Sequence, residues 1–170
     1  MQRATAARSP DLTQPLIGYR EWVMIGDELL SPLARAHWGA EPMRAECVPI
    51  CRTARGLWRV PSEHEGPAPD PGCVCGLYAV FEPPRIRGRE RLTVARGAVA
   101  LWGRIELHRR GMRAEFAQIV LLSLPPSRRS AAAVGKLAEH LGVEAVAAKD
   151  LPVAALAYGR PLEPSLIPRT

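Results

Sequence analysis

The sequence lacks asparagine entirely and contains only two lysines, whereas it contains 21 arginines. Its formal net charge of +6 therefore comes almost wholly from arginine. Such a skew, together with abundant alanine, glycine and proline, is typical of proteins encoded by high-GC genomes. The number of arginines alone therefore does not indicate that the protein binds nucleic acid.

Long apolar runs are also missing. No segment approaches the roughly 18 to 20 consecutive apolar residues that a membrane-spanning helix needs. The first residues, MQRATAARSPDLTQPL, have no apolar core of the kind found in signal peptides. We therefore expect no membrane partner and a cytoplasmic location. Because the cytosol keeps thiols reduced, the four cysteines are expected to be thiols or metal ligands rather than disulfides.

The glycine motifs that bind phosphate are absent as well. The sequence contains no G-x-G-x-x-G pattern, and VGKLAEH lacks the leading glycine and the following hydroxyl residue of a P-loop. Glu106, His108 and Glu115 could assemble an acid–base site on one hairpin, but such a set is more typical of a salt-bridged surface. The sequence therefore assigns no catalytic residue and favours a non-catalytic protein.

The residues that are present suffice for one domain with its own core, because 47% of the 170 residues are hydrophobic. We predict an α+β protein: an antiparallel β-sheet or small barrel with a metal-stapled loop, followed by two C-terminal helices. The predicted parts are a flexible N-terminus over residues 1–17, a β-rich domain with the Cys/His loop over 18–124, and a C-terminal helical element with an extended tail over 125–170.

Two hairpins support the β-rich part. Gly97 to Leu124 gives the clearest strand signal, with a turn at HRRGM. Within it, one parity carries apolar residues and the other carries polar ones, as in a strand with one buried face: Val99, Leu101, Ile105 and Leu107 against Arg104, Glu106 and His108. A shorter hairpin is predicted in GYREWVMIGDELL, where Gly26 and Asp27 form the turn. These two patterns favour antiparallel pairing.

Two helices are predicted in the C-terminal part. Ser130 can cap a helix over AAAVGKLAEHL, in which apolar residues recur at three- and four-residue spacing before Gly142 ends it. Asp150 can cap a second helix, LPVAALAY, which Gly159 ends. We expect these helices to pack together.

Cysteine and histidine residues gather in the middle of the chain. Cys47 and Cys51 form a C-x3-C pair, Cys73 and Cys75 form a C-x-C pair, and His64 lies between the pairs. A structural zinc ion needs four tetrahedral nitrogen or sulfur donors, usually delivered as two close pairs from separate loops. The predicted ligands of a structural zinc ion are Cys47, His64, Cys73 and Cys75, with Cys51 as the substitute ligand.

The surrounding loop supports a bound cation. Residues 61–82 include four acidic residues and no basic residue, which disfavours thiolates unless a cation neutralises them. Gly76 allows the backbone to turn directly after Cys75. Two alternatives remain open: scattered cysteines that act as small buried residues, and a redox-active couple of Cys73 and Cys75.

A second concentration of charge lies between residues 85 and 113, which include nine arginines and only two glutamates. The rest of the chain is nearly neutral, so genome composition does not explain the position of this charge. Such a patch can contact phosphates, although it can also be a solvated loop that pairs with the acidic loop. The candidate nucleic-acid-binding residues are Arg85, Arg87, Arg89, Arg91, Arg109 and Arg110.

The combination GYREW…LLSP…HW…C…H…P…CVCGLYA…GAVALWGRIELHRRGMRAE resembles a pattern of small uncharacterised proteins from high-GC bacteria. The resemblance covers Gly18 to Glu115 and implies no activity or site residue. From the predicted zinc ligands and the absence of a catalytic motif, we expect a non-catalytic, zinc-stabilised binding or adaptor module with a protein partner. The alternatives are a nucleic-acid-associated protein that uses the arginines, and a small metal-dependent hydrolase in which water replaces one ligand and Glu63 or Glu65 acts as base.

Overall fold

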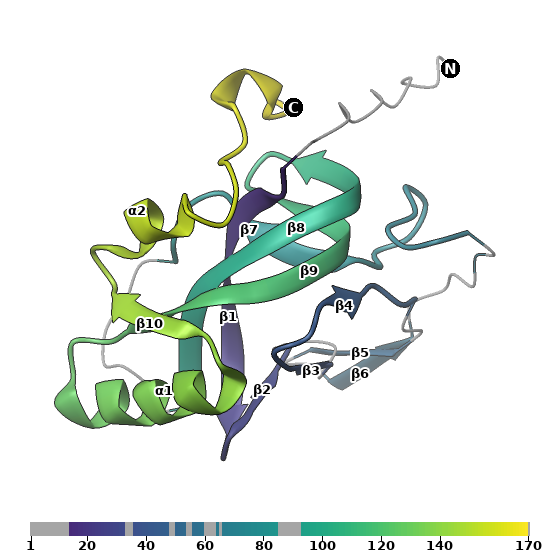
Figure 1. The fold of residues 1–170 in the computed structure, drawn as a ribbon. Coiled ribbons are helices and arrows are strands. Elements are labelled where there is room, and N and C mark those ends of the chain that lie inside the picture. The colour runs from purple at the N-terminus through teal and green to yellow at the C-terminus, as the bar shows by residue number, and fades with distance from the viewer. Residues whose placement is uncertain are drawn as a thin grey trace.

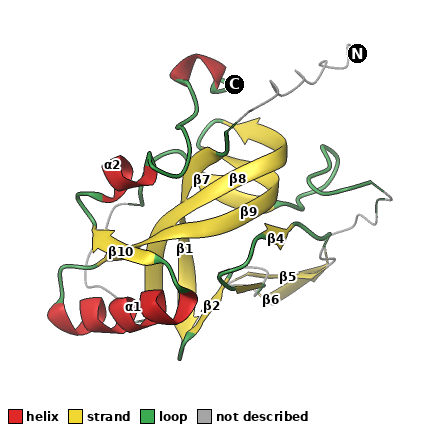
Figure 2. Ribbon diagram, viewed as in Figure 1, coloured by secondary structure: helices red, strands yellow, loops and turns green. Residues whose placement is uncertain are grey.

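The computed structural model describes residues 14–32, 36–47, 50–53, 56–59, 64, 66–84 and 93–169, and for residues 50–53 and 56–59 it describes the backbone alone. The chain has an α+β fold with a mostly antiparallel sheet and two C-terminal helices, as predicted (Figures 1 and 2). The elements in chain order are β1 (Leu16–Ile25), β2 (Glu28–Leu30), β3 (His37–Trp38), β4 (Met43–Arg44), β5 (Ile50–Thr53), β6 (Gly56–Arg59), β7 (Leu77–Val80), β8 (Val94–His108), β9 (Gly111–Leu124), α1 (Arg128–Leu141), β10 (Glu144–Ala147), α2 (Leu151–Ala155) and the 3-10 helix η1 (Pro164–Leu166).

Four strands close into a circuit of hydrogen-bonded pairs. β1 pairs with β8, β8 with β9 and β9 with β7, and β7 returns to β1 through the pair of Tyr19 and Val80. All four pairings are antiparallel. Shorter strands extend from this circuit, with β2 on β1, β3 on β2 and β4 on β9, while β5 and β6 form a separate hairpin. The prediction of an antiparallel sheet or small barrel is therefore confirmed.

Both predicted hairpins are present. β8 and β9 are joined at Arg109 and Arg110, and β1 and β2 are joined at Gly26 and Asp27. β1 begins at Leu16, two residues before the predicted start of the β-rich domain. The turns could be predicted from the sequence because tight turns favour a narrow set of residue types.

The long β8–β9 hairpin is divided by irregular pairing. The register shifts between Ala98 and Val99 and again between Trp102 and Ile105, and such irregularities bend a strand and increase its twist. One half of the hairpin, called the base half here, lies beside β1, whereas the tip half, beyond Trp102, lies beside β7. The circuit closes because the bent hairpin reaches both neighbours.

β1 approaches β7 closely at Gly18. A Cβ atom at this position would lie 2.6 Å from the Cβ of Ala79, a distance that real Cβ atoms essentially never show. The absence of a side chain therefore lets the two strands meet at the distance that closes the circuit.

The base half of β8 is buried on both faces, where the alternation predicted one buried face. Val99 and Leu101 belong to the main core, whereas Ala98 and Ala100 pack in a second cluster with Leu151 of α2. The prediction was wrong for this half because α2 covers the face that would otherwise meet solvent. In the tip half the alternation holds, since Ile105 is buried and the residue before it is exposed.

α1 starts earlier than predicted. Its N-cap is Ser127, whose hydroxyl accepts a hydrogen bond of 3.5 Å from the Ser130 amide, and Ser130 itself is buried within the helix. The predicted end is confirmed, since Gly142 follows the helix in a left-handed conformation with φ of 64°. α1 has 14 residues, and none of the described helices is long and apolar enough to cross a membrane.

An unpredicted strand, β10, lies between the two helices (Figure 2). It pairs in parallel with the end of β9, with Val146 opposite Ser123, so the C-terminal part extends the sheet. α1 packs in the main core and α2 in the second cluster, which replaces the expected packing of one helix on the other. Asp150 precedes α2 without a side-chain capping bond, and α2 ends at Ala155, before the predicted end at Gly159.

Candidate metal centre

The four predicted metal ligands come together beside the start of β7. Cys73 and Cys75 lie in the loop that leads into β7, Cys47 follows β4, and His64 lies between β6 and this loop. Their donor atoms, three sulfurs and one nitrogen, all lie within 4.8 Å of one another. This Cys/His cluster can hold a metal ion such as zinc. The substitute ligand Cys51 lies in β5, where the structure describes no side chains.

A β-turn positions the C-x-C pair. The Cys73 amide donates to the Asp70 carbonyl at 2.9 Å, and the Gly72 amide donates to the Asp70 carboxylate at 2.8 Å. Aspartate at the first position and proline, here Pro71, at the second are residues that β-turns favour. The turn therefore reverses the chain immediately before the first thiol.

Gly76 turns the chain from the second thiol into β7. Its φ of 126° lies in the region that side chains rarely adopt, and a Cβ atom there would lie 3.1 Å from the Cβ of Arg113 and 3.2 Å from that of Pro69. Both the backbone conformation and the space therefore favour glycine. The predicted turn directly after Cys75 is present.

Two donor–donor distances can be compared with those of a tetrahedral zinc site, and the sulfur–sulfur distance matches while the nitrogen–sulfur distance is shorter. The sulfurs of Cys47 and Cys73 are 3.6 Å apart, and His64 Nε2 lies 3.1 Å from the Cys75 sulfur. With Zn–S bonds of about 2.3 Å and Zn–N bonds of about 2.0 Å, tetrahedral donors are separated by about 3.5–3.8 Å. A disulfide would instead require sulfurs about 2.05 Å apart. The donor set therefore fits a zinc ion better than a disulfide between Cys47 and Cys73.

The ring of His64 is oriented for coordination. Its Nδ1 lies 2.8 Å from the carbonyl oxygen of Gly66, which can only accept, so we assign the ring proton to Nδ1. This assignment leaves the lone pair of Nε2 directed toward the Cys75 sulfur. Metal-bound histidines are usually held through their second nitrogen in this way.

Burial and crowding oppose ionisation of the thiols. The pKa of Cys47 is raised to about 11, first by desolvation and then by the neighbouring Cys73 and Cys75. Desolvation also raises the pKa of Cys75, although the Asp70 backbone and the Arg113 guanidinium act in the opposite direction. Raised pKa values do not favour the redox-active couple, which needs a reactive thiolate. A divalent cation would remove the repulsion between the thiolates.

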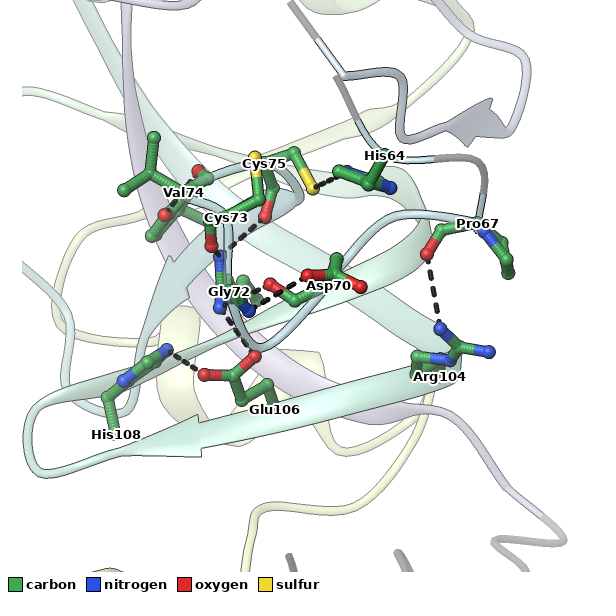
Figure 3. A network of polar contacts seen from close by, with 12 residues as sticks. His64, Pro67, Asp70, Gly72, Cys73, Val74, Cys75, Arg104, Glu106 and His108 are labelled. Carbon is green, nitrogen blue, oxygen red and sulfur yellow. Dashed lines mark hydrogen bonds and ion pairs between the residues drawn. The ribbon is translucent and has the colours of Figure 1, made fainter. Parts of the chain in front are cut away.

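A buried arginine fastens the C-x-C segment to β9. Arg113 is 3% exposed, and its Nη1 donates to the carbonyls of Cys73 and Cys75, the latter at 2.9 Å. Its Nη2 donates to the Asp70 carbonyl at 3.1 Å and to the Glu106 carboxylate at 2.5 Å. Dashed lines in Figure 3 mark these contacts. The sequence pattern placed Arg113 only within the basic segment, and no local signal distinguished it from its neighbours.

Two of the residues considered for acid–base chemistry, Glu106 and Glu115, form ion pairs with arginines, and the third, His108, lies beside Glu106. Glu106 lies between Arg113 and His108, with His108 Nε2 at 3.5 Å from its carboxylate. Glu115 pairs instead with Arg44 at 3.1 Å. These contacts agree with the expected salt-bridged surface.

The structure places two of the six candidate nucleic-acid-binding arginines. Arg109 and Arg110 are exposed at the tip of the β8–β9 hairpin. The two glutamates considered as bases, Glu63 and Glu65, lie outside the described residues. The remaining candidates that lie outside the described residues are Arg85, Arg87, Arg89 and Arg91.

No family model, curated protein or solved structure matches the chain. The fold alone does not assign a function, because one architecture can carry many unrelated activities. The function is therefore inferred from the geometry and chemistry of the Cys/His cluster.

Proposed function

We propose that this protein is a non-catalytic binding or adaptor module whose Cys/His loop is stabilised by a structural zinc ion. The observation that supports this proposal is the convergence of four donor atoms, from Cys47, His64, Cys73 and Cys75, within 4.8 Å. Three cysteines and one histidine form a common set for structural zinc. Four protein ligands close such a site, whereas a hydrolytic site keeps one position for water.

The zinc ion would cross-link parts of the chain that have little regular structure. Between β6 and β7, the described residues form turns, bends and irregular chain, without a helix or strand. Because no helix or strand holds these described residues, a metal that joins them to the chain after β4 restricts their conformations. The ion would therefore act as a staple between the loop and the sheet.

The same staple would fix a group of exposed apolar side chains. Val74, between the two thiols, is 54% exposed, and Tyr78 and Val80 on β7 are 44% and 38% exposed. The Tyr78 hydroxyl donates to the Val74 carbonyl at 2.6 Å, so the loop and the strand lie together. Neighbouring exposed apolar side chains are typical of contact surfaces, which supports a binding role.

Metal analysis of protein purified without chelators tests the proposal. We expect one zinc ion per chain, lost in Cys47→Ser and in Cys75→Ser because each variant removes one ligand. Cys51→Ser is the matched control and should retain zinc, because Cys47, His64, Cys73 and Cys75 already supply the four donors of a tetrahedral site. Wild-type protein that neither contains nor takes up zinc would contradict the proposal.

X-ray absorption of the bound zinc separates the structural from the hydrolytic assignment. We expect three sulfur neighbours and one nitrogen neighbour around the metal. A coordination shell in which water replaces a cysteine or the histidine would support the metal-dependent hydrolase instead.

A further inference from the structure

Two side chains that face each other across β7 and β9 hold the carbonyls of the C-x-C segment. Tyr78 and Arg113 are directly opposed in this pairing. Arg113 donates to the carbonyls of Cys73 and Cys75, and the Tyr78 hydroxyl donates to the carbonyl of Val74. Residues 73–75 belong to no strand or helix, and carbonyls outside regular structure need other hydrogen-bond donors when they are buried. All three consecutive carbonyls are instead bound by side chains of the sheet.

The charge of Arg113 also suits a thiolate–zinc centre. A zinc ion with three thiolates and one neutral histidine carries a net charge of −1, because the three thiolates outweigh the dication. Arg113 is buried against the segment that supplies two of those thiols, and its Nη1 lies 2.9 Å from the carbonyl oxygen of Cys75. Burying a guanidinium is costly unless its donors are bound, and here Nη1 and Nη2 bind four acceptors, while Nε is buried without a hydrogen-bond partner among the described residues.

We propose that Arg113 is a positioning residue of the metal centre, which fixes the C-x-C backbone for coordination and offsets the negative charge of the zinc-bound thiolates. The inference rests on the proposed zinc site and adds a residue that is not itself a ligand. An arginine suits this position because its planar group spreads five donors over several acceptors, whereas a lysine ammonium concentrates three donors at one point.

Zinc affinity, measured by competition with a chromophoric chelator, tests the inference. Arg113→Met should bind zinc about 10- to 100-fold more weakly than the wild type, as is typical when a residue that supports metal ligands is lost. Arg113→Lys should recover part of the affinity, because it keeps the charge but not the planar fork. Tyr78→Phe should have a smaller effect, since water can replace its hydroxyl at this exposed position.

Arg20→Met is the matched control. Arg20 also bonds β7, through its Nη1 and the Tyr78 carbonyl, but its further contacts are with Ser31, at 2.9 Å, and with the ring of Trp38. These described contacts do not include the C-x-C segment. Removing either arginine is expected to reduce stability, so equal losses of zinc affinity in the two variants would show that Arg113 acts only through the stability of the fold.

Cobalt(II) substitution adds a readout of coordination geometry. We expect the visible spectrum of cobalt-loaded Arg113→Met to differ from that of the wild type, while that of Arg20→Met matches it.

If Arg113→Met does not fold, wild-type zinc affinity in Arg113→Lys would overturn the importance of the planar fork. Wild-type protein that binds no zinc contradicts the proposed function itself. Unchanged zinc affinity and cobalt spectrum in a folded Arg113→Met contradict only the role of Arg113.

Discussion

The two halves of the β8–β9 hairpin are stabilised in different ways. The base half is apolar and lies between the main core, which includes α1, and the cluster that includes α2. The tip half adjoins β7 and carries Arg113, whose contacts hold the C-x-C segment. Burial of apolar surface needs no defined partner, whereas polar groups in the interior need particular ones. The tip half also contributes Ile105, Met112 and Ala114 to the main core, so one pair of strands joins a region held by packing to a region in which specific polar contacts add to packing.

Removal of zinc should have the largest effect on stability, and it should affect the tip half more than the base half. At a free zinc concentration about 1,000 times the Kd, binding contributes about 4 kcal/mol to the free energy of unfolding, and chelation removes this contribution. Hydrogen exchange should show that the C-x-C segment and β7 lose protection first, while the base half retains more. An equal loss of protection over both halves would contradict the separation.

A cavity in the base half should lower the free energy of unfolding by a similar or smaller amount. This loss should not depend on whether zinc is bound. Leu122 is fully buried in the main core and pairs with Gly97 and with Ala145 of β10, away from β7. Leu122→Ala should lower the free energy of unfolding by about 2–5 kcal/mol, measured by urea denaturation. The loss should be the same with and without zinc to within about 0.5 kcal/mol. A larger difference would show that the two halves are coupled.

The sequence predicts best those features that depend on neighbouring residues. The hairpin turns and the C-cap Gly142 follow from residue types at local positions, and the structure has them where expected. The Cys/His cluster could also be predicted from the sequence, because few residue types bind zinc and the spacing of the cysteines limits which of them can act together as ligands. The structure brings together the preferred set of Cys47 with His64 and the C-x-C pair.

The features that were missed depend on contacts between distant segments. Arg113 belongs to the same basic segment as the exposed Arg109 and Arg110, but it is buried where its guanidinium binds the carbonyls of the C-x-C segment. β10 is a four-residue segment whose strand character comes from pairing with β9. Periodicity reports which faces of an element are apolar, but it does not report which distant element covers them.

The smallest effects on stability are expected at two glycines, one inside α1 and one at its C-cap. At these positions the backbone preference can be tested apart from packing. A Cβ atom at Gly135 or at Gly142 would meet no atom within 4 Å, so substitutions there act mainly through the backbone. Gly142 is left-handed, with φ of 64°, and Gly142→Ala should destabilise the protein by about 1–2 kcal/mol. Gly135 lies inside the helix, and Gly135→Ala should stabilise the protein by about 0.5–1 kcal/mol. Urea denaturation measures both changes, and zinc affinity should stay at the wild-type value in each variant. A change in zinc affinity would show that the helical region influences the metal centre and that the two regions are not independent.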